Sequence, residues 1–183
     1  MTQSKHTFTV KNINTFTGRE GYGYSCNLYL NNKKVAVVTD NADGGPLDIF
    51  WNGPKIFDVT TRSLDFEISQ EYLTHKGTEA ESILEKMIME LPMISIQGSQ
   101  PFYSNSEIFI DDLVNDTLLQ QKISRILKKE IFILENKQIF SYKIKPTQDS
   151  VKINNYIAKN KPTAIIINEK PIEEVVKIFK EHS

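Results

Sequence analysis

Residue types suited to binding gather between positions 18 and 54 of this sequence. Tyr22, Tyr24 and the only tryptophan offer flat rings for stacking, and the tyrosines add hydroxyl groups. A pair of glycines beside a carboxylate leaves backbone amides open to hydrogen bonding, because glycine has no Cβ to block close approach. We therefore predict binding of a partner or ligand here, and we predict no catalytic and no metal-ligating residue. The predicted binding residues are Tyr22, Tyr24, Asp43, Gly44, Gly45 and Trp51.

Carboxylates in the same stretch support a different hypothesis. Asp40, Asp43 and Asp48 could together hold a divalent ion, which would make the chain a carboxylate-dependent enzyme acting on a nucleotide or nucleic acid. An EF-hand loop is excluded, because its first and twelfth ligand positions would be Thr39 and Phe50. The single cysteine and three widely separated histidines form no metal-binding motif of the C-x-x-C or H-E-x-x-H kind.

A β-hairpin is expected to position the predicted binding residues. Apolar and polar residues alternate on both sides of Asn31-Asn32, and asparagine tolerates the positive φ that a two-residue turn requires. Because the open ends of a hairpin lie side by side, the glycine-bearing segments before and after it should converge. The predicted cross-strand pairs are Leu30 with Lys33, Leu28 with Val35, and Cys26 with Val37.

Periodicity along the remaining chain predicts an α+β fold in one domain over residues 1–183. A strand-rich part, residues 1–70, forms a mostly antiparallel sheet, and a helical and mixed part covers residues 78–183 with about four helices. Additional strands are predicted at Thr7–Ile13, Pro46–Trp51 and Ser63–Ile68.

The second part begins with a capping box, Thr78 to Glu81, that predicts a helix ending near Pro92. A second hairpin is expected around Asn136-Lys137, with Ile133 facing Phe140 and Ile131 facing Tyr142. The other predicted elements are a helix from Asp111 or Asp112 to about Lys129, a helix from Ser150 to about Lys159, a central strand buried on both faces at Thr163–Ile167, and a helix after Pro171.

Composition is ordinary for a soluble globular protein, with 39% hydrophobic residues, 25% charged residues and a net charge of −1. No apolar run long enough to span a bilayer and no signal-peptide pattern occurs, so we predict a cytoplasmic protein without membrane association. Charge is uneven: Arg62–Leu119 carries net −8 and Gln120–Ser183 carries net +6. Interleaved lysines and tyrosines in the basic part could bind single strands, but the net charge and the lack of a motif disfavour nucleic acid.

Several short motifs carry a resemblance. G-Y-x-Y-S, L-Y-L-x-x-K-K-V-A, D-x-x-D-G-G-P and the following Trp, all within the first third of the chain, resemble small uncharacterised proteins of bacteriophages and mobile elements. The resemblance implies an accessory protein that acts on a host system, and it implies no chemistry.

Function is therefore predicted to be non-enzymatic binding of a host protein or a small nucleotide-like ligand, without a cofactor. The metal-dependent enzyme is the first alternative and a purely structural or oligomeric component is the second. The oligomeric state is left open.

Overall fold

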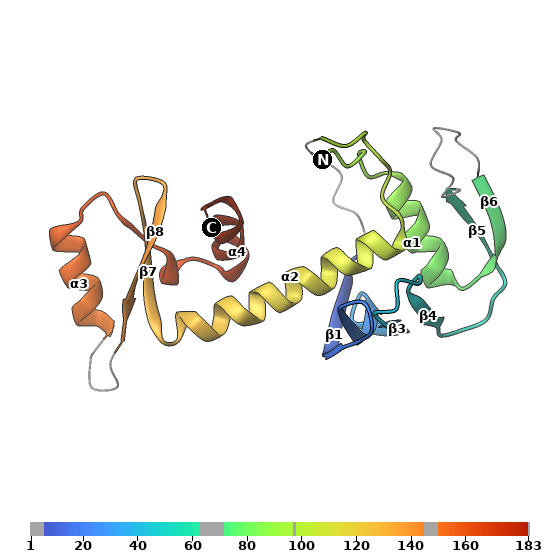
Figure 1. The fold of residues 1–183 in the computed structure, drawn as a ribbon, viewed down its shortest axis with the longest axis horizontal. Helices are drawn as coiled ribbons and strands as arrows, with labels where there is room; N and C mark the ends of the chain where they lie inside the picture. Colours follow the sequence, from blue (N-terminus) through green and yellow to red (C-terminus); the bar gives the residue numbers. More distant parts are fainter. Residues whose placement is uncertain (1–5, 63–71, 97, 145–149, 183) are drawn as a thin grey trace. The chain divides into compact units, whose positions relative to one another are not determined.

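The computed structural model describes residues 6–62, 72–96, 98–144 and 150–182. These residues contain four α-helices and three sheets, and all strand pairs are antiparallel (Figure 1). The predicted α+β class with antiparallel strands and about four helices is confirmed.

Two compact units divide the chain, Met1–Asn115 and Asp116–Ser183, called unit 1 and unit 2 below. Helix α2 (Ser106–Leu127) contributes residues to both units. Each unit is described by itself. The prediction of a single domain stays a prediction, and the boundary between the units does not coincide with the predicted division between residues 70 and 78.

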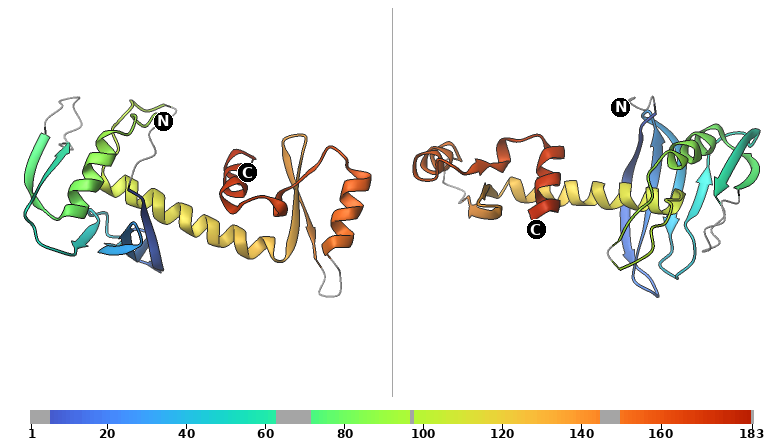
Figure 2. Two further views of the ribbon diagram at one scale, coloured as in Figure 1. Left: turned by 180° about the vertical axis from the view of Figure 1, so that it is seen from behind. Right: turned by 90° about the horizontal axis from the view of Figure 1, so that it is seen from above.

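Four strands of unit 1 form an antiparallel meander in which each strand pairs with the next along the chain. The right view of Figure 2 shows these strands side by side. The predicted meander is therefore present, with a longer first strand and a shorter fourth strand than expected. The strands are β1 (Phe8–Thr17), β2 (Tyr22–Leu30), β3 (Lys33–Asp40) and β4 (Asp48–Trp51).

The turn between β2 and β3 is the predicted Asn31-Asn32 pair. Its φ angles are 48° and 67°, both in the left-handed region that asparagine tolerates better than most residues. Such a turn matches the right-handed twist of the two strands it joins. Asn31 Oδ1 also accepts a hydrogen bond of 2.9 Å from the Thr7 N–H, which ties the turn to the beginning of β1.

The predicted register of this hairpin is wrong beyond the pairs next to the turn. Leu28 pairs with Ala36 and Cys26 pairs with Val38, each one residue later on β3 than expected. The shift lies between Leu28 and Tyr29, where β3 carries one extra residue as a β-bulge. Because side chains alternate between the two faces, the bulge turns Ala36 and Val38 toward the core, where both are 0% exposed.

The first half of α2 covers the buried face of this sheet. Phe8 on β1 meets Phe109 edge to face, with ring centroids 6.4 Å apart. Tyr24 on β2 donates a hydrogen bond of 2.5 Å from its hydroxyl to Asp111 Oδ1. Ile110, between these two contacts, is 0% exposed and anchors the helix in the core of unit 1.

Helix α2 begins earlier than predicted. Asn105 Oδ1 accepts a hydrogen bond of 2.9 Å from the Ile108 N–H, which is the geometry of an N-terminal cap. The predicted start at Asp111 or Asp112 is therefore wrong, because both residues lie inside the helix. Asp111 instead partners a tyrosine hydroxyl from the sheet, a role that depends on a strand far away in the sequence.

A two-stranded sheet and helix α1 complete unit 1. The helix packs on the sheet through the Ser82 hydroxyl, which donates to the Asp58 carbonyl at 3.0 Å. Neither strand was predicted, and the predicted strand Ser63–Ile68 lies outside the described residues. The elements are β5 (Phe57–Arg62), β6 (Tyr72–Gly77) and α1 (Glu79–Met89).

The predicted capping box begins α1. Thr78 Oγ1 accepts from the Glu81 N–H at 3.3 Å, and Glu81 Oε2 accepts from the Thr78 N–H at 3.1 Å. The helix ends at Met89 with Glu90 as its C-terminal cap, close to the predicted end near Pro92.

Unit 2 is built from three layers, with a sheet between helices. Helix α3 packs on one face through Ile157, which contacts Ile131 and Ile133 of the central strand. Phe132, which points to the opposite face, packs with residues of α2 and α4. Figure 1 shows α3 and α4 on opposite sides of the hairpin formed by β7 and β8. The elements are β7 (Glu130–Glu135), β8 (Gln138–Lys143), α3 (Ser150–Asn160), β9 (Ile165–Ile166), the 3₁₀ turn η1 (Ile167–Glu169) and α4 (Ile172–His182).

The second hairpin has the predicted register. Ile133 pairs with Phe140 and Ile131 pairs with Tyr142 across β7 and β8. Its turn, Asn136-Lys137, has φ angles of 51° and 62°, as in the first hairpin. The helices predicted from Ser150 and after Pro171 are also present, as α3 and α4.

The apolar run Thr163–Ile167 was predicted as a central strand buried on both faces, and this prediction is wrong. Only Ile165–Ile166 forms a strand, and it lies at the edge of the sheet with order β8-β7-β9. Ile165 is 46% exposed. A short apolar run cannot by itself distinguish a central strand from a segment that enters a turn.

Asn168 in η1 holds this turn against the junction of α2 and β7. Its Oδ1 accepts from the Phe132 N–H at 2.7 Å. Its Nδ2 donates to the carbonyls of Leu127 and Glu130 at 3.1 and 2.9 Å. One side chain thus satisfies three backbone groups that lie 36 to 41 residues earlier in the chain.

Replacing Asn168 with alanine is expected to lower the free energy of unfolding by about 1–2 kcal/mol, because three partly buried backbone groups lose their partner. Urea unfolding followed by circular dichroism measures this loss. Asn160→Ala is the control, since the exposed Asn160 donates only to the Tyr156 carbonyl one helical turn away. Equal losses in both variants would contradict the role assigned to Asn168.

Candidate functional site

The two glycine-bearing segments at the open end of the first hairpin converge as predicted. Tyr24 pairs with Asp40 at the last rung of the hairpin. Beyond it, the Glu20 N–H donates to the Ala42 carbonyl at 2.8 Å. Gly18 packs so closely that a Cβ there would lie 2.6 Å from the Ala42 Cβ. Residues 18–23 and 40–46 thus form one surface, called the open-end loops below.

Close packing also explains Gly23 of the open-end loops, and backbone conformation explains Gly44. A Cβ on Gly23 would overlap the Asp40 carbonyl oxygen and the Phe16 ring, which lies over this glycine from the neighbouring strand. Gly44 has a φ of 78°, which side chains rarely adopt. Both glycines therefore shape the loops, and the sequence alone did not show that Phe16 covers one of them.

Each of the three predicted metal-binding carboxylates instead accepts a hydrogen bond from a nearby group of the chain. Asp40 Oδ1 accepts from the Ala42 N–H at 2.8 Å, and Asp43 Oδ1 accepts from the Gly45 N–H at 3.1 Å. Asp48 Oδ2 accepts from Asn41 Nδ2 at 2.7 Å. Within the described residues, no group of three or more His, Cys, Asp or Glu is placed to hold a metal ion. The geometry lends the divalent-ion hypothesis no support.

Tyr22 is the most exposed aromatic residue of the predicted set. It begins β2, pairs with Thr17 on β1, and keeps 83% of its surface accessible. Asp43, Gly44 and Gly45 are also exposed. The structure therefore brings four of the six predicted binding residues to the surface of the open-end loops.

Tyr24, in contrast, belongs to the core. It is 8% exposed, and its hydroxyl is taken by Asp111. Burial, and then this hydrogen bond, raise the pKa of the Tyr24 hydroxyl far above its usual range. Burial also raises the pKa of Asp111. Tyr24 contributes to stability, and its ring cannot stack on a ligand.

Trp51 lies away from the open-end loops. It pairs with Ala36 on β3 and is half-buried at the end of β4. Asp40 lies four positions beyond Ala36 on β3, which corresponds to roughly 13 Å along a strand. The residue that β4 places next to the open end is Asp48, opposite Thr39.

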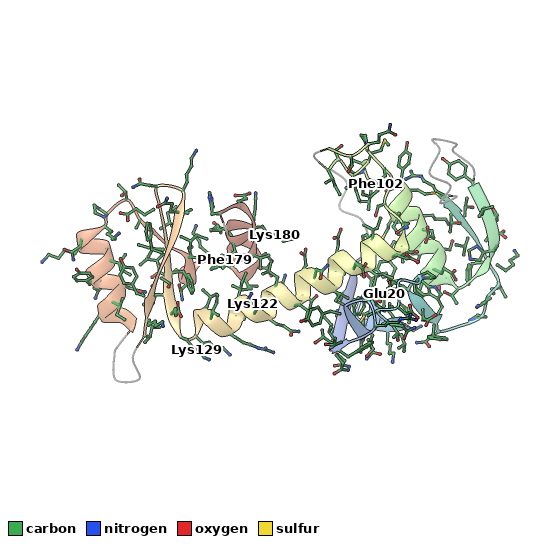
Figure 3. All side chains as sticks on the ribbon, viewed as in Figure 1. Glu20, Phe102, Lys122, Lys129, Phe179 and Lys180 are labelled. Atoms are coloured by element: carbon green, nitrogen blue, oxygen red, sulfur yellow. The ribbon has the colours of Figure 1, made fainter. Side chains whose placement is uncertain are left out.

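The surface of the open-end loops is acidic. Glu20, missed by the sequence analysis, lies with Asp43 and Asp48 on the exposed side of the loops, where Arg19 is the one basic residue. A count of charged side chains along both converging segments would have indicated this acidic character. Figure 3 labels Glu20, which lies in the loop between β1 and β2.

Two further observations complete the description of the site. Burial raises the pKa of the Cys26 thiol to about 11, so it is protonated at neutral pH and is a weak nucleophile. No helix within the described ranges is long and apolar enough to cross a membrane. In comparisons with known proteins, the chain matches no family model, no curated protein and no solved structure.

Proposed function

We propose that this chain is a non-enzymatic binding protein that contacts a protein partner through the open-end loops, in the manner of an accessory factor that binds a host protein. The observation that carries the proposal is Tyr22, an aromatic ring 83% exposed on a loop pair that is otherwise held tightly by backbone contacts. Aromatic residues on rigid supports are the usual anchors of protein interfaces, because they bury a large area at small entropic cost.

Charge favours a protein partner over a nucleotide-like ligand. Glu20, Asp43 and Asp48 give the loops an acidic surface that repels phosphate groups. Helix N-termini and glycine-rich phosphate loops are the common ways to bind nucleotides, and the glycines here lead into a strand instead. The partner surface we propose is therefore basic, with an apolar recess for the Tyr22 ring.

The use of the polar groups argues against catalysis at these loops. The carboxylates of Asp40 and Asp43 accept from backbone N–H groups of turns, that of Asp48 accepts from the Asn41 side chain, and the Tyr24 hydroxyl donates to Asp111. A general acid or base needs a group that is free to reach a substrate. The alternative of a metal-dependent enzyme is retained as an outcome of the test below.

Replacing Tyr22 with alanine is expected to weaken binding of the partner by about tenfold or more, because a central aromatic anchor is lost. A tagged chain captures the partner from a host lysate, and titration with the purified partner then compares dissociation constants. Tyr156→Ala is the matched control, since Tyr156 is 63% exposed on α3 of unit 2. Thermal unfolding should be unchanged in both variants, because neither ring is buried.

Three outcomes would contradict this proposal. One is equal binding by the Tyr22 and Tyr156 variants. A second is a rise in melting temperature with a nucleotide panel, which would favour the small-ligand hypothesis by mass action. The third is a rise in melting temperature with divalent ions that Asp43→Asn abolishes, which would favour the hypothesis of a metal-dependent enzyme.

A further inference from the structure

An apolar groove lies between α2 and α4 of unit 2, and the function proposed above does not use it. Its volume is about 460 Å³, within the range of protein sites that bind apolar side chains or small molecules. It is open to solvent on one side. The lining residues are Leu119, Lys122, Ile123, Ile126, Phe179 and Lys180.

The floor of the groove is held by the core of unit 2. The Phe179 ring meets Phe132 edge to face, with centroids 5.3 Å apart. Ile123 is 1% exposed and belongs to the same buried cluster. Leu119 and Ile126 are only partly buried, so their outer surfaces remain available. A floor anchored in this way keeps its shape when a partner binds.

The edges of the groove are basic. Lys180 on α4 bonds Asp116 on α2 at 2.5 Å and so closes one end of the groove. Lys122 lines the groove from α2, and the exposed Arg125 and Lys129 follow it along the chain. Among the described residues, none of these last three forms an ion pair. Figure 3 labels Lys122, Lys129, Phe179 and Lys180.

The net charge of the whole unit points in the same direction. Unit 2 contains thirteen Lys or Arg and eight Asp or Glu, a net charge of +5. The charge of this unit therefore favours anionic over cationic partners at an apolar groove with a basic edge.

We propose that this groove binds an acidic amphipathic helix of a partner protein. Leu119, Lys122, Ile123 and Ile126 follow the i, i+3, i+4, i+7 spacing of one helical stripe, which is the surface that a second helix packs against. Leucine-type anchors of the partner would fill the groove, and its glutamates would face Lys122 and Arg125.

The length of the basic surface favours a helix over a small anionic amphiphile such as a fatty acid. From Lys122 to the end of α2 at Leu127 the chain advances roughly 7.5 Å at helical rise, and Lys129 follows in the turn after the helix. A single carboxylate needs one cation at the mouth of the groove, whereas a helix with repeated acidic residues can pair with several basic side chains along α2.

Binding to synthetic probes tests this proposal on the full chain. The first probe is a fluorescent 18-residue peptide (about five helical turns) with leucines at i, i+3, i+4 and i+7 and glutamates on both flanks. A second peptide carries lysine in place of glutamate, and dodecanoate represents a small amphiphile. The glutamate peptide is expected to bind at least about tenfold more tightly than the lysine peptide. Equal affinity of the two peptides would overturn the proposal. Binding of dodecanoate without binding of the glutamate peptide would also overturn it.

A pair of charge-reversal variants tests whether the peptide binds at the groove. Lys122→Glu should weaken binding of the glutamate peptide by at least about fivefold, because attraction between opposite charges is replaced by repulsion. Lys152→Glu is the matched control, since Lys152 is exposed on α3, which covers the opposite face of the unit 2 sheet. Both side chains are exposed, so neither change should alter the melting temperature. Unchanged affinity in Lys122→Glu would exclude the groove as the binding site.

Discussion

Replacing Leu28 with alanine is expected to lower the free energy of unfolding by about 2–5 kcal/mol, the largest stability effect we predict. Leu28 is 0% exposed in the middle of β2 and pairs with Val10 on one side and Ala36 on the other. With strands on both sides and the helical layer above, the surrounding side chains cannot collapse fully into the space that is left. Denaturant unfolding followed by tryptophan fluorescence, from the single Trp51 of unit 1, measures the loss.

Leu30→Ala is the matched control for this prediction. Leu30 lies on the same strand next to the turn, is only partly buried, and pairs with Phe8 and Lys33. Its truncation removes the same atoms with less burial, so we expect a loss of less than about 1.5 kcal/mol. Similar losses at both positions would contradict the core that the bulged register builds around Leu28.

Replacing Tyr24 with phenylalanine is expected to cost about 2–3 kcal/mol at neutral pH, because the partly buried Asp111 carboxylate loses its hydrogen-bond donor. The ring is retained, so packing changes little and the loss reports on the hydroxyl. Urea unfolding of the wild type, Tyr24→Phe, Asp111→Asn and the double variant completes a double-mutant cycle. A coupling energy near zero between the two positions would contradict the contact.

The same pair also makes stability depend on pH. Burial raises the native-state pKa of Asp111 above its unfolded value, so the folded protein binds this proton more strongly than the unfolded chain. The contribution of Asp111 to stability is therefore fully present below its unfolded pKa, about 4, and is lost as pH rises through the raised native value. Because the Tyr24 hydrogen bond lowers the Asp111 pKa, its removal should extend this loss to higher pH.

Asp111→Asn isolates this contribution from that of Glu85, whose native pKa is also raised by burial. Asparagine does not titrate, so the variant should gain stability relative to the wild type as the pH increases from about 4 to 8. Unfolding free energies measured across this range test the sign. The burial of Asp111 would be contradicted if the difference in unfolding free energy between the two proteins stayed constant with pH. It would also be contradicted if that difference grew in favour of the wild type as the pH increased.

The two surfaces proposed for binding would select partners of opposite charge. Unit 1 holds nine Lys or Arg and fifteen Asp or Glu, and its open-end loops display Glu20 and Asp43. Unit 2 is basic and borders its groove with Lys122. A basic protein surface suits the first and an acidic helix suits the second, so one chain could connect two different partners.

Several features of the candidate site follow from the sequence. Asn31-Asn32 indicated a two-residue turn, and that turn makes the flanking glycine segments converge, as the hydrogen bond from Glu20 to Ala42 confirms. Exposure of Tyr22 was also expected. Convergence depends on the length of a turn, which local residue types decide.

Other features of the site could not be predicted. Tyr22 and Tyr24 have the same type and nearly the same neighbours, yet one is exposed and the other is buried against Asp111, 87 residues further along the chain. The position of Trp51 depends on how β4 pairs with β3, which no residue near Trp51 specifies. Sequence patterns identify which side chains could bind a ligand, and only the packing decides which ones are covered.

The sequence by itself determined the elements whose signals are local: the capping box of Thr78 and Glu81, the two asparagine-containing turns, and the register of the second hairpin. These depend on hydrogen bonds and φ preferences within a few residues. Only the tertiary structure decided the bulge in β3, the early start of α2, the edge position of β9, and the groove between α2 and α4. Each of these depends on which distant surfaces bury one another, and the free energy of that burial exceeds the local preferences that a pattern records.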